Sequence, residues 1–271
     1  MENVIIKPFI EKQCDALYEL IVLSINSTYP EYYPKEAVEY FVNYQNKDIY
    51  LADSKKGQIL LLYNGDILTG TGTIIGSHVK RVFFHPQHLH KGYGKKMMEE
   101  LESIAHKNNE TYIDLHSSFY AKRFYDKLNY KLLKVHGFAV ENEERLYYQR
   151  MVKILQKQES SYINIHNKKF NIIKNDGPGA EVNENTIFQF YQHEHVIYAT
   201  YHGGEIEFGE LIGTISNSTM KFNYSQININ KEWNEGHSSV TIDNSSEKLR
   251  LIDNWQWDSK EGTGECIFQE M

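Results

Sequence analysis

Hydrophobic and polar positions follow two alternating patterns through the first 153 residues. In some segments apolar residues recur every three or four positions, the period of a helix, and in others every second position, the period of a strand. This predicts a strand, two helices, a hairpin, a strand, a long helix, a strand, a helix and two final strands. The predicted ranges are 4–9, 10–21, 34–42, 58–64 with 67–76, 79–86, 91–107, 111–117, 118–128, 130–138 and 145–153.

From about residue 154 the helical period vanishes and short alternating segments separated by turns take its place. These segments lie at 186–192, 195–203, 205–216, 219–229, 238–244, 248–257 and 265–271. Strands at this regular spacing predict an antiparallel β-sandwich or up-and-down barrel. We therefore expect an α/β domain over 1–153, a polar linker at about 154–161 and an all-β accessory domain over 162–271.

Charge separates the same two halves. Residues 1–153 hold 20 Lys and Arg against 19 Asp and Glu, whereas residues 154–271 hold 9 against 17. Nucleic-acid binding needs a basic patch, so no nucleic-acid partner is expected, least of all for the second half. No apolar run approaches the length of a membrane span, and no signal peptide is expected. Two distant cysteines, Cys14 and Cys266, favour a reducing, cytoplasmic compartment.

Glycines in the stretch Leu89-His90-Lys91-Gly92-Tyr93-Gly94 mark the turn between a predicted strand and the long helix. The turn lacks the Gly-Lys-Ser/Thr of a P-loop and the third glycine of a dinucleotide fingerprint. The first amides of a helix have no intrahelical acceptor and carry partial positive charge. Lys91, Lys95 and Lys96 add full charges nearby. The turn therefore suits a pyrophosphate, although a plain change of direction would use the same glycines.

The order of elements and two motifs resemble the GCN5-related N-acetyltransferases (GNAT) over residues 2–153. In that family the turn reads Arg/Gln-x-x-Gly-x-Gly/Ala, and here Leu89 replaces the polar first residue. A second match lies at 117–130, "SSFYAKRFYDKLNY", where Ser118, Ala121, Phe124 and Tyr125 fall in place. Asn129 and Tyr130 replace Gly-Phe, and Asn is the best substitute for glycine in the left-handed position that ends a helix.

This resemblance implies a GNAT fold, acetyl-CoA as co-substrate and an amine of a small molecule or peptide as acceptor. The strand before the turn would contribute backbone groups to the pantetheine arm, and the turn amides would bind the pyrophosphate. Ser118 would contact the cofactor or only cap a helix. Lys122 and Arg123 could meet the 3′-phosphate or simply face solvent. The implied cofactor-binding residues are Val82, Phe83, Phe84, His90, Lys91, Gly92, Tyr93, Gly94, Lys95 and Ser118.

Tyr125 matches the family's general acid, which would protonate the departing CoA thiolate. The alternative is a core tyrosine on the same face as Ala121, Phe124 and Leu128. The general base is open, because a carboxylate, an imidazole or water can take the amine proton. Candidates within reach are Asp114, His116, His85 and Tyr33. The aromatic stretch 28–34 lies where this family shapes its acceptor pocket, which suggests an acceptor with an apolar body.

The second half resembles small β-barrel proteins often labelled N-acetylglutamate synthase, and it carries no cofactor motif. His193, Glu194 and His195 invite a metal interpretation, but no third ligand stands at a defined spacing, so a hairpin turn is favoured and no metal is expected. Trp255 and Trp257 alternate toward one face, where they are expected to fill the barrel.

The sequence thus predicts a cytoplasmic N-acetyltransferase with an accessory barrel. One alternative is an enzyme similar to N-acetylglutamate synthase, which would need a basic site for two carboxylates. The other is an acetyl-CoA-binding sensor, which Leu89 keeps open. The acceptor and the oligomeric state, including a homo-oligomer, are not defined by the sequence.

Overall fold

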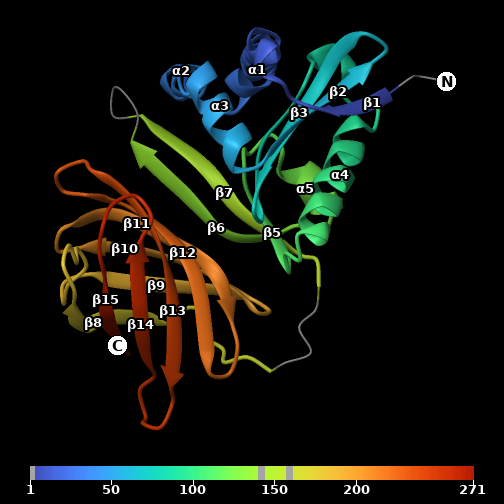
Figure 1. Ribbon diagram of the computed structural model, residues 1–271. Helices are drawn as coiled ribbons and strands as arrows, with labels where there is room; N and C mark the ends of the chain where they lie inside the picture. The colour runs from blue at the N-terminus through green and yellow to red at the C-terminus, as the bar shows by residue number, and fades with distance from the viewer. Residues whose placement is uncertain (1–3, 140–143, 157–160) are drawn as a thin grey trace. The chain divides into compact units, whose positions relative to one another are not determined.

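The computed structural model describes residues 4–139, 144–156 and 161–271. The chain separates into two compact units, Met1–Lys157 and Gln158–Met271, which Figure 1 draws in blue to green and in yellow to red. The division falls within the polar stretch expected as a linker. That each unit folds independently stays a prediction.

The first unit is built on a seven-stranded sheet in the order β1-β2-β3-β4-β5-β7-β6. Neighbouring strands are antiparallel, with the exception of β4 and β5, which run parallel. The strands are β1 (Val4–Pro8), β2 (Gln58–Asn64), β3 (Ile67–Ile75), β4 (His78–Phe84), β5 (Tyr112–Ser117), β6 (Lys131–Ala139) and β7 (Arg145–Ile154).

Helices cover both faces of this sheet, because alternate side chains of its strands enter two separate cores. In β2, Leu60 and Leu62 belong to one core, whereas Ile59 and Leu61 belong to the other. The first core is closed by α4 (Tyr93–Lys107) and α5 (Lys122–Lys127), and the second by α1 (Cys14–Thr28), α2 (Lys35–Asn43) and α3 (Lys47–Lys56). Short 3₁₀ turns lie at Glu11–Gln13, Tyr29–Glu31 and Pro86–His88. Figure 1 shows the two helical layers on either side of the strands.

The second unit is a closed antiparallel barrel of eight strands in the order β10-β11-β12-β13-β14-β15-β8-β9. Strict alternation along β13 buries every second residue, so one face of the strand fills the interior. The strands are β8 (Lys169–Asp176), β9 (Ile187–His193), β10 (Val196–Gly203), β11 (Ile206–Ile215), β12 (Thr219–Asn228), β13 (Trp233–Asp243), β14 (Arg250–Trp257) and β15 (Thr263–Glu270).

The predicted fold class is confirmed in both halves, and two elements were missed. Helix α3 has only Tyr50 and Asp53 buried, so its apolar period is too weak to read. Strand β8 buries Phe170 and Ile172 among lysines and asparagines. The predicted helix 118–128 is wrong at its start, because residues 118–121 form a turn and α5 begins at Lys122.

Two local predictions agree with the structure. Asn129 has a φ of 68° and so takes the left-handed position expected of it. Glu194 and His195 form the turn between β9 and β10, with Glu194 at a φ of 51°. No helix in the described part of the chain is both long and apolar enough to cross a membrane.

Candidate functional site

The sheet of the first unit forks between its two parallel strands. β4 and β5 are paired only at His78 with Asp114 and at Val79 with Leu115. Beyond Val79, no described strand pairs with the β5-facing edge of β4. The opposite edge stays in the sheet, since Phe83 and Phe84 are paired with Thr71 and Gly70 of β3. The fork therefore leaves backbone groups of β4 available on one side only.

Three of the predicted cofactor-binding residues lie along this open edge. Val82 and Phe84 pack their side chains against the core beneath α4, and Phe83 packs against the core beneath α1. The register with β3 slips just before them, where Arg81 has a φ of 55°. A bulge of this kind re-aims the backbone of a strand at its rim. The side chains of these residues are half-buried, and their main chain lies along the open edge.

The glycine turn follows directly after β4. His90 and Gly92 have φ values of 62° and 82°, and Gly92 is the N-cap of α4. The first bond within the helix is donated by Lys96 to the carbonyl of Gly92, at 3.1 Å. The amides of Gly94 and Lys95 precede that bond, so they have no acceptor within the helix. This end of α4 presents the partial positive charge that favours an anion.

The turn requires glycine at two positions, and the structural reason differs between them. A side chain at Gly92 would point into open space, so its positive φ is the constraint. At Gly94, a Cβ would lie 3.0 Å from the ring of Phe124 and 3.6 Å from that of Phe84. Gly94 thus lets the start of α4 approach two aromatic rings. Tyr93 is buried in the core and stacks on His88, at 6.2 Å between ring centroids.

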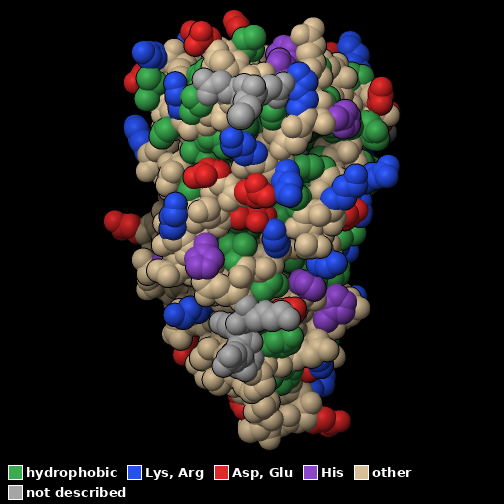
Figure 2. Space-filling view, turned by 90° about the vertical axis from the view of Figure 1, so that its right-hand side faces the viewer, with side chains coloured by type: hydrophobic (Ala, Val, Ile, Leu, Met, Phe, Trp, Pro, Cys, Tyr) green, Lys and Arg blue, Asp and Glu red, His purple; other side chains and the backbone are tan. Residues whose placement is uncertain are grey.

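The lysines of the turn do not act alike. Lys91 and Lys95 are exposed, and Lys95 lies 3.7 Å from Glu99 one helical turn along. Lys96 instead donates to the carbonyl of Val4, at 2.9 Å, and so ties α4 to β1. Figure 2 shows basic and acidic side chains interspersed on the face of this unit that it displays. On this face the charges thus form no broad basic surface, whereas the N-terminal end of α4 offers backbone amides to an anion.

Ser118 and Tyr125 lie on the turn and helix after β5. The hydroxyl of Ser118 accepts the amide of Ala121 at 3.3 Å and so closes the turn before α5; the N-cap of that helix is Ala121, so the helix-capping role predicted for Ser118 is not observed. Lys122, a candidate for the 3′-phosphate, is 2.7 Å from Asp126, whereas Arg123 is exposed.

Tyr125 is buried in the core that also holds Val82 and Phe84 of β4. Its ring packs against Phe124 and Tyr130, at 5.0 and 5.5 Å between centroids. Burial, with Tyr29 as the second cause, raises the pKa of Tyr125 well above that of a free phenol. The hydroxyl therefore stays protonated throughout the neutral range and can act as a donor.

An aromatic group from the stretch 29–41 reaches the fork, and only its first part was anticipated. Tyr29 contacts Tyr33, Phe41 and Phe83, with ring centroids 5.3, 4.9 and 6.3 Å away. The hydroxyl of Tyr33 accepts the amide of Phe119 at 3.1 Å. Tyr29 and Tyr33 belong to the aromatic stretch 28–34 that was expected to shape an acceptor pocket, whereas Phe41 lies outside that stretch and was not anticipated in it.

The four candidate bases are in different states. Asp114 is buried and bound by His78 and Arg150, at 2.6 and 2.8 Å. Burial opposes the charge of this carboxyl, but Arg150 and His78 hold its pKa below the usual value. A carboxylate that is held by a guanidinium and an imidazole is a poor proton acceptor.

The other three candidate bases are no better suited than Asp114 to accept a proton. Loss of hydration and the charge of the adjacent Arg150 lower the pKa of His116 well below its usual value. Because the His116 side chain is still exposed to solvent, we attribute this lowering mainly to Arg150. Burial raises the pKa of Tyr33 to about 12, which keeps it protonated. The Nδ1 atom of His85 accepts the amide of Gln87 at 3.3 Å. None of the four candidates is thus distinguished as the general base, and the base stays open.

Comparison with known proteins assigns a class to each unit. Residues 29–155 match the family model described as acetyltransferase (GNAT) domain, and residues 163–271 match the one described as avidin-like protein. The first unit is therefore similar to GNAT acetyltransferase domains, and the second is similar to avidin-like proteins. No curated protein matches the sequence.

Several solved structures match the first unit, and one of them, with a TM-score of 0.53, shows its fold. A GCN5-related N-acetyltransferase from Rhodopseudomonas palustris is 18% identical, with a TM-score of 0.53, over 57% of this chain and 97% of its own. The PaiA N-acetyltransferase from Thermoplasma acidophilum, in complex with coenzyme A, is 20% identical, with a TM-score of 0.46, over 56% and 99%. At these identities the likeness concerns the fold alone.

Proposed function

We propose that the first unit is an N-acetyltransferase that moves an acetyl group from acetyl-CoA to an amine. The observation that carries this proposal is the fork between β4 and β5, followed at once by a glycine turn that opens α4. The fork offers backbone groups to an extended chain, and the helix end offers amides to an anion. Acetyl-CoA combines these two shapes, since an extended pantetheine arm ends in a pyrophosphate.

The predicted residues would divide the binding between them. The main chain of Val82, Phe83 and Phe84 would bind the pantetheine arm along the open edge. The amides from His90 to Lys95 would hold the pyrophosphate, with the charge of Lys91 adding to them. An amide of β4 would stabilise the negative charge that develops on the thioester oxygen during attack.

Tyr125 would then supply the proton that the departing thiolate needs. A free thiol has a pKa of about 8.5, far below that of the buried phenol. Complete proton transfer from Tyr125 to the thiolate is thus unfavourable. The main contribution of Tyr125 would be a hydrogen bond to the sulfur as the C–S bond breaks. The aromatic group at Tyr29, Tyr33 and Phe41 would form the apolar part of an acceptor pocket.

Thiol release tests this proposal against the sensor alternative. Full-length protein is incubated with acetyl-CoA and a panel of amines that includes alkylamines, amino acids and peptide N-termini. The proposal requires amine-dependent appearance of free CoA thiol and of an acetylated product. Acetyl-CoA binding without turnover on any amine would favour the sensor, and turnover confined to glutamate would favour the N-acetylglutamate synthase-like enzyme.

A further inference from the structure

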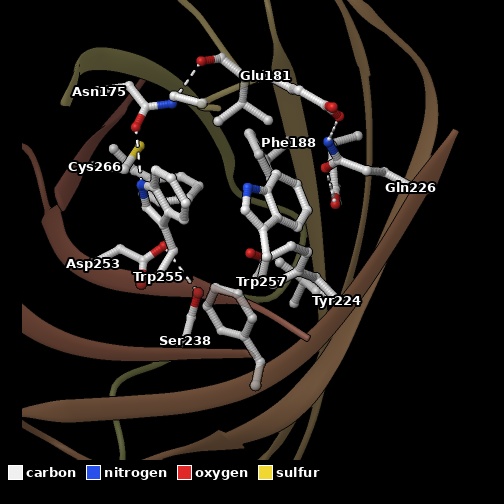
Figure 3. A pocket seen from close by; sticks show the side chains of 16 residues that line it. Asn175, Glu181, Phe188, Tyr224, Gln226, Ser238, Asp253, Trp255, Trp257 and Cys266 are labelled. Atoms are coloured by element: carbon white, nitrogen blue, oxygen red, sulfur yellow. Dashed lines mark hydrogen bonds between the residues drawn. The ribbon is translucent and has the colours of Figure 1, made fainter. Parts of the chain in front are cut away.

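The interior of the barrel holds a cavity that the acetyltransferase proposal leaves unused. It measures about 40 Å³ for water-sized spheres, which is room for about three non-hydrogen atoms. Figure 3 shows side chains from several strands converging on it, together with Glu181 from the segment between β8 and β9. The polar groups at its wall are Asn175, Glu181, Tyr201, Tyr224, Gln226, Ser238 and Asp253.

Asp253 is the exceptional group in this wall. It is 3% exposed, and its Oδ2 atom accepts a hydrogen bond from Ser238 at 3.1 Å. Its Oδ1 atom is buried, and no described residue gives it a hydrogen bond. A buried carboxylate oxygen that lacks a donor is costly, so native structures nearly always supply one. Because Asp253 lines the cavity, an occupant of the cavity can supply this donor.

The second carboxylate at the cavity is fully used. Glu181 accepts hydrogen bonds from Gln226, Asn228 and Asn234, and it pairs with Lys260 at 2.5 Å. None of the described residues that line the cavity is Lys, Arg or His. Lys260 is matched to Glu181, and no described Lys, Arg or His that lines the cavity balances the charge of Asp253. This arrangement favours a positively charged occupant.

The remaining walls are aromatic and suit the same occupant. Trp255 and Trp257 lie 5.8 Å apart between ring centroids, and Tyr224 lies 5.3 Å from Trp257. The ammonium of Lys260 already rests over Trp257, at 4.4 Å from the ring centroid. The face of an aromatic ring attracts ammonium groups, most strongly where water is excluded.

We propose that the barrel binds the ammonium head of a small amine, with Asp253 as its counter-ion and Trp255 and Trp257 as its aromatic walls. The amine would donate one N–H to Oδ1 of Asp253 and present its carbon atoms to the rings. This site is separate from the acetyl-transfer site proposed above, and it gives the accessory unit a ligand of the chemical class on which the first unit would act.

Tryptophan fluorescence of the full-length protein tests this site selectively. The chain has three tryptophans, Trp233, Trp255 and Trp257, and all belong to the second unit. Ethylamine is titrated at about pH 8.5, where it is charged, with ethanol as the uncharged partner of equal size. A ligand of about three atoms binds no tighter than roughly millimolar. We expect a saturable change with ethylamine, and at least about tenfold weaker binding of ethanol.

The variant Asp253→Asn keeps the shape of the side chain and removes its charge, so it should lose at least about tenfold in ethylamine affinity. Asp243→Asn is the matched control, since Asp243 lies in the same barrel outside the cavity. Sodium chloride at equal concentration controls for ionic strength.

A pH titration of the wild-type protein gives a second test that needs no variant. Burial raises the pKa of Asp253 to about 7, and burial also raises the pKa values of Tyr201, Tyr224 and Cys266 far above neutrality. The other carboxylate of the cavity, Glu181, is paired with Lys260. Ethylamine binding should therefore weaken as the pH falls below about 7. Equal binding of ethanol and ethylamine, a pH-independent affinity or the absence of any fluorescence change would overturn the proposal.

Discussion

Val79 and Leu115 are the last residues at which β4 and β5 lie in register. Every feature assigned to the acetyltransferase site lies on the open side of that pair. Phe83 and Phe84 continue β4, the glycine turn follows, and Ser118 leads from β5 toward Tyr125. One break in strand pairing thus brings together segments that are about 30 residues apart in sequence.

Charge at the glycine turn should control acetyl-CoA affinity. Gly92→Asp and Gly92→Asn place nearly identical side chains in open space, and both residues tolerate a positive φ and serve as N-caps. Asp puts a negative charge where the pyrophosphate would bind, so calorimetry should show at least about tenfold weaker binding than with Asn. Equal affinities of the two variants would remove the turn from the binding site.

Removing the hydroxyl of Tyr125 should affect turnover and leave cofactor binding intact. Tyr125→Phe keeps the buried ring, so kcat should fall by about 10²-fold while acetyl-CoA affinity stays near that of the wild type. Because burial places the pKa of Tyr125 above the usual assay range, the alkaline limb of the pH profile should not move.

Tyr130→Phe is the matched control for that experiment. Tyr130 packs against Tyr125, but its own hydroxyl donates to Glu102 at 3.2 Å. Its loss should alter stability and leave kcat largely unchanged. Wild-type turnover by Tyr125→Phe would show that Tyr125 is a core residue, with the proton coming from elsewhere.

Arg150 should be needed for the stability of the first unit. Arg150→Met leaves the buried carboxylate of Asp114 with His78 as its remaining ion-pair partner. Breaking a buried pair on one side lowers the free energy of unfolding by about 3 kcal/mol or more. Urea unfolding followed by helical circular dichroism measures this, because the described α-helices all lie in the first unit. Lys35→Met, which removes an exposed pair with Glu39, should change little.

The stability lost in Arg150→Met should depend on pH, because the pKa of Asp114 is lowered in the folded wild-type protein. In the wild type its ion pairs contribute stability above the unfolded pKa of about 3.9, and this contribution disappears as the pH falls through the lower folded value. Without Arg150, burial favours the neutral carboxyl. The difference in the free energy of unfolding between the wild type and Arg150→Met should therefore shrink as the pH is lowered from 7 toward 5. A deficit that is constant over this range would contradict the charge-based explanation.

The two units should unfold separately. Circular dichroism of helices reports the first unit, and tryptophan emission reports the second. Arg150→Met should shift the first transition and leave the second in place. The fragment 161–271 should keep native emission and unfold cooperatively. Coincident shifts of both transitions would mean that the units share their stability.

Hydrophobic periodicity predicted most of this fold because most elements bury a regular apolar face. It failed where the buried positions are polar. Asp53 of α3 is buried against Arg81 and Lys80, and no apolar pattern signals such a pair. The fork between β4 and β5 was also out of reach, because parallel pairing between distant segments leaves no local trace in the sequence.

The barrel cavity, by contrast, had a signal that went unread. Leu251, Asp253, Trp255 and Trp257 follow one another at every second position of β14, and all four are buried. A carboxylate in an inward register between apolar residues indicates either a pairing partner or a ligand. The tryptophans were correctly expected to face the barrel interior, and Asp253 between them was overlooked.

Amide hydrogen exchange with and without acetyl-CoA tests the central claim most directly, namely that the fork and the helix end hold this co-substrate. We expect added acetyl-CoA to slow exchange in peptides covering residues 80–95 and 118–128, and to leave the barrel over 161–271 unchanged. Unaltered exchange at 80–95 in protein that binds acetyl-CoA, or protection confined to the barrel, would contradict the account.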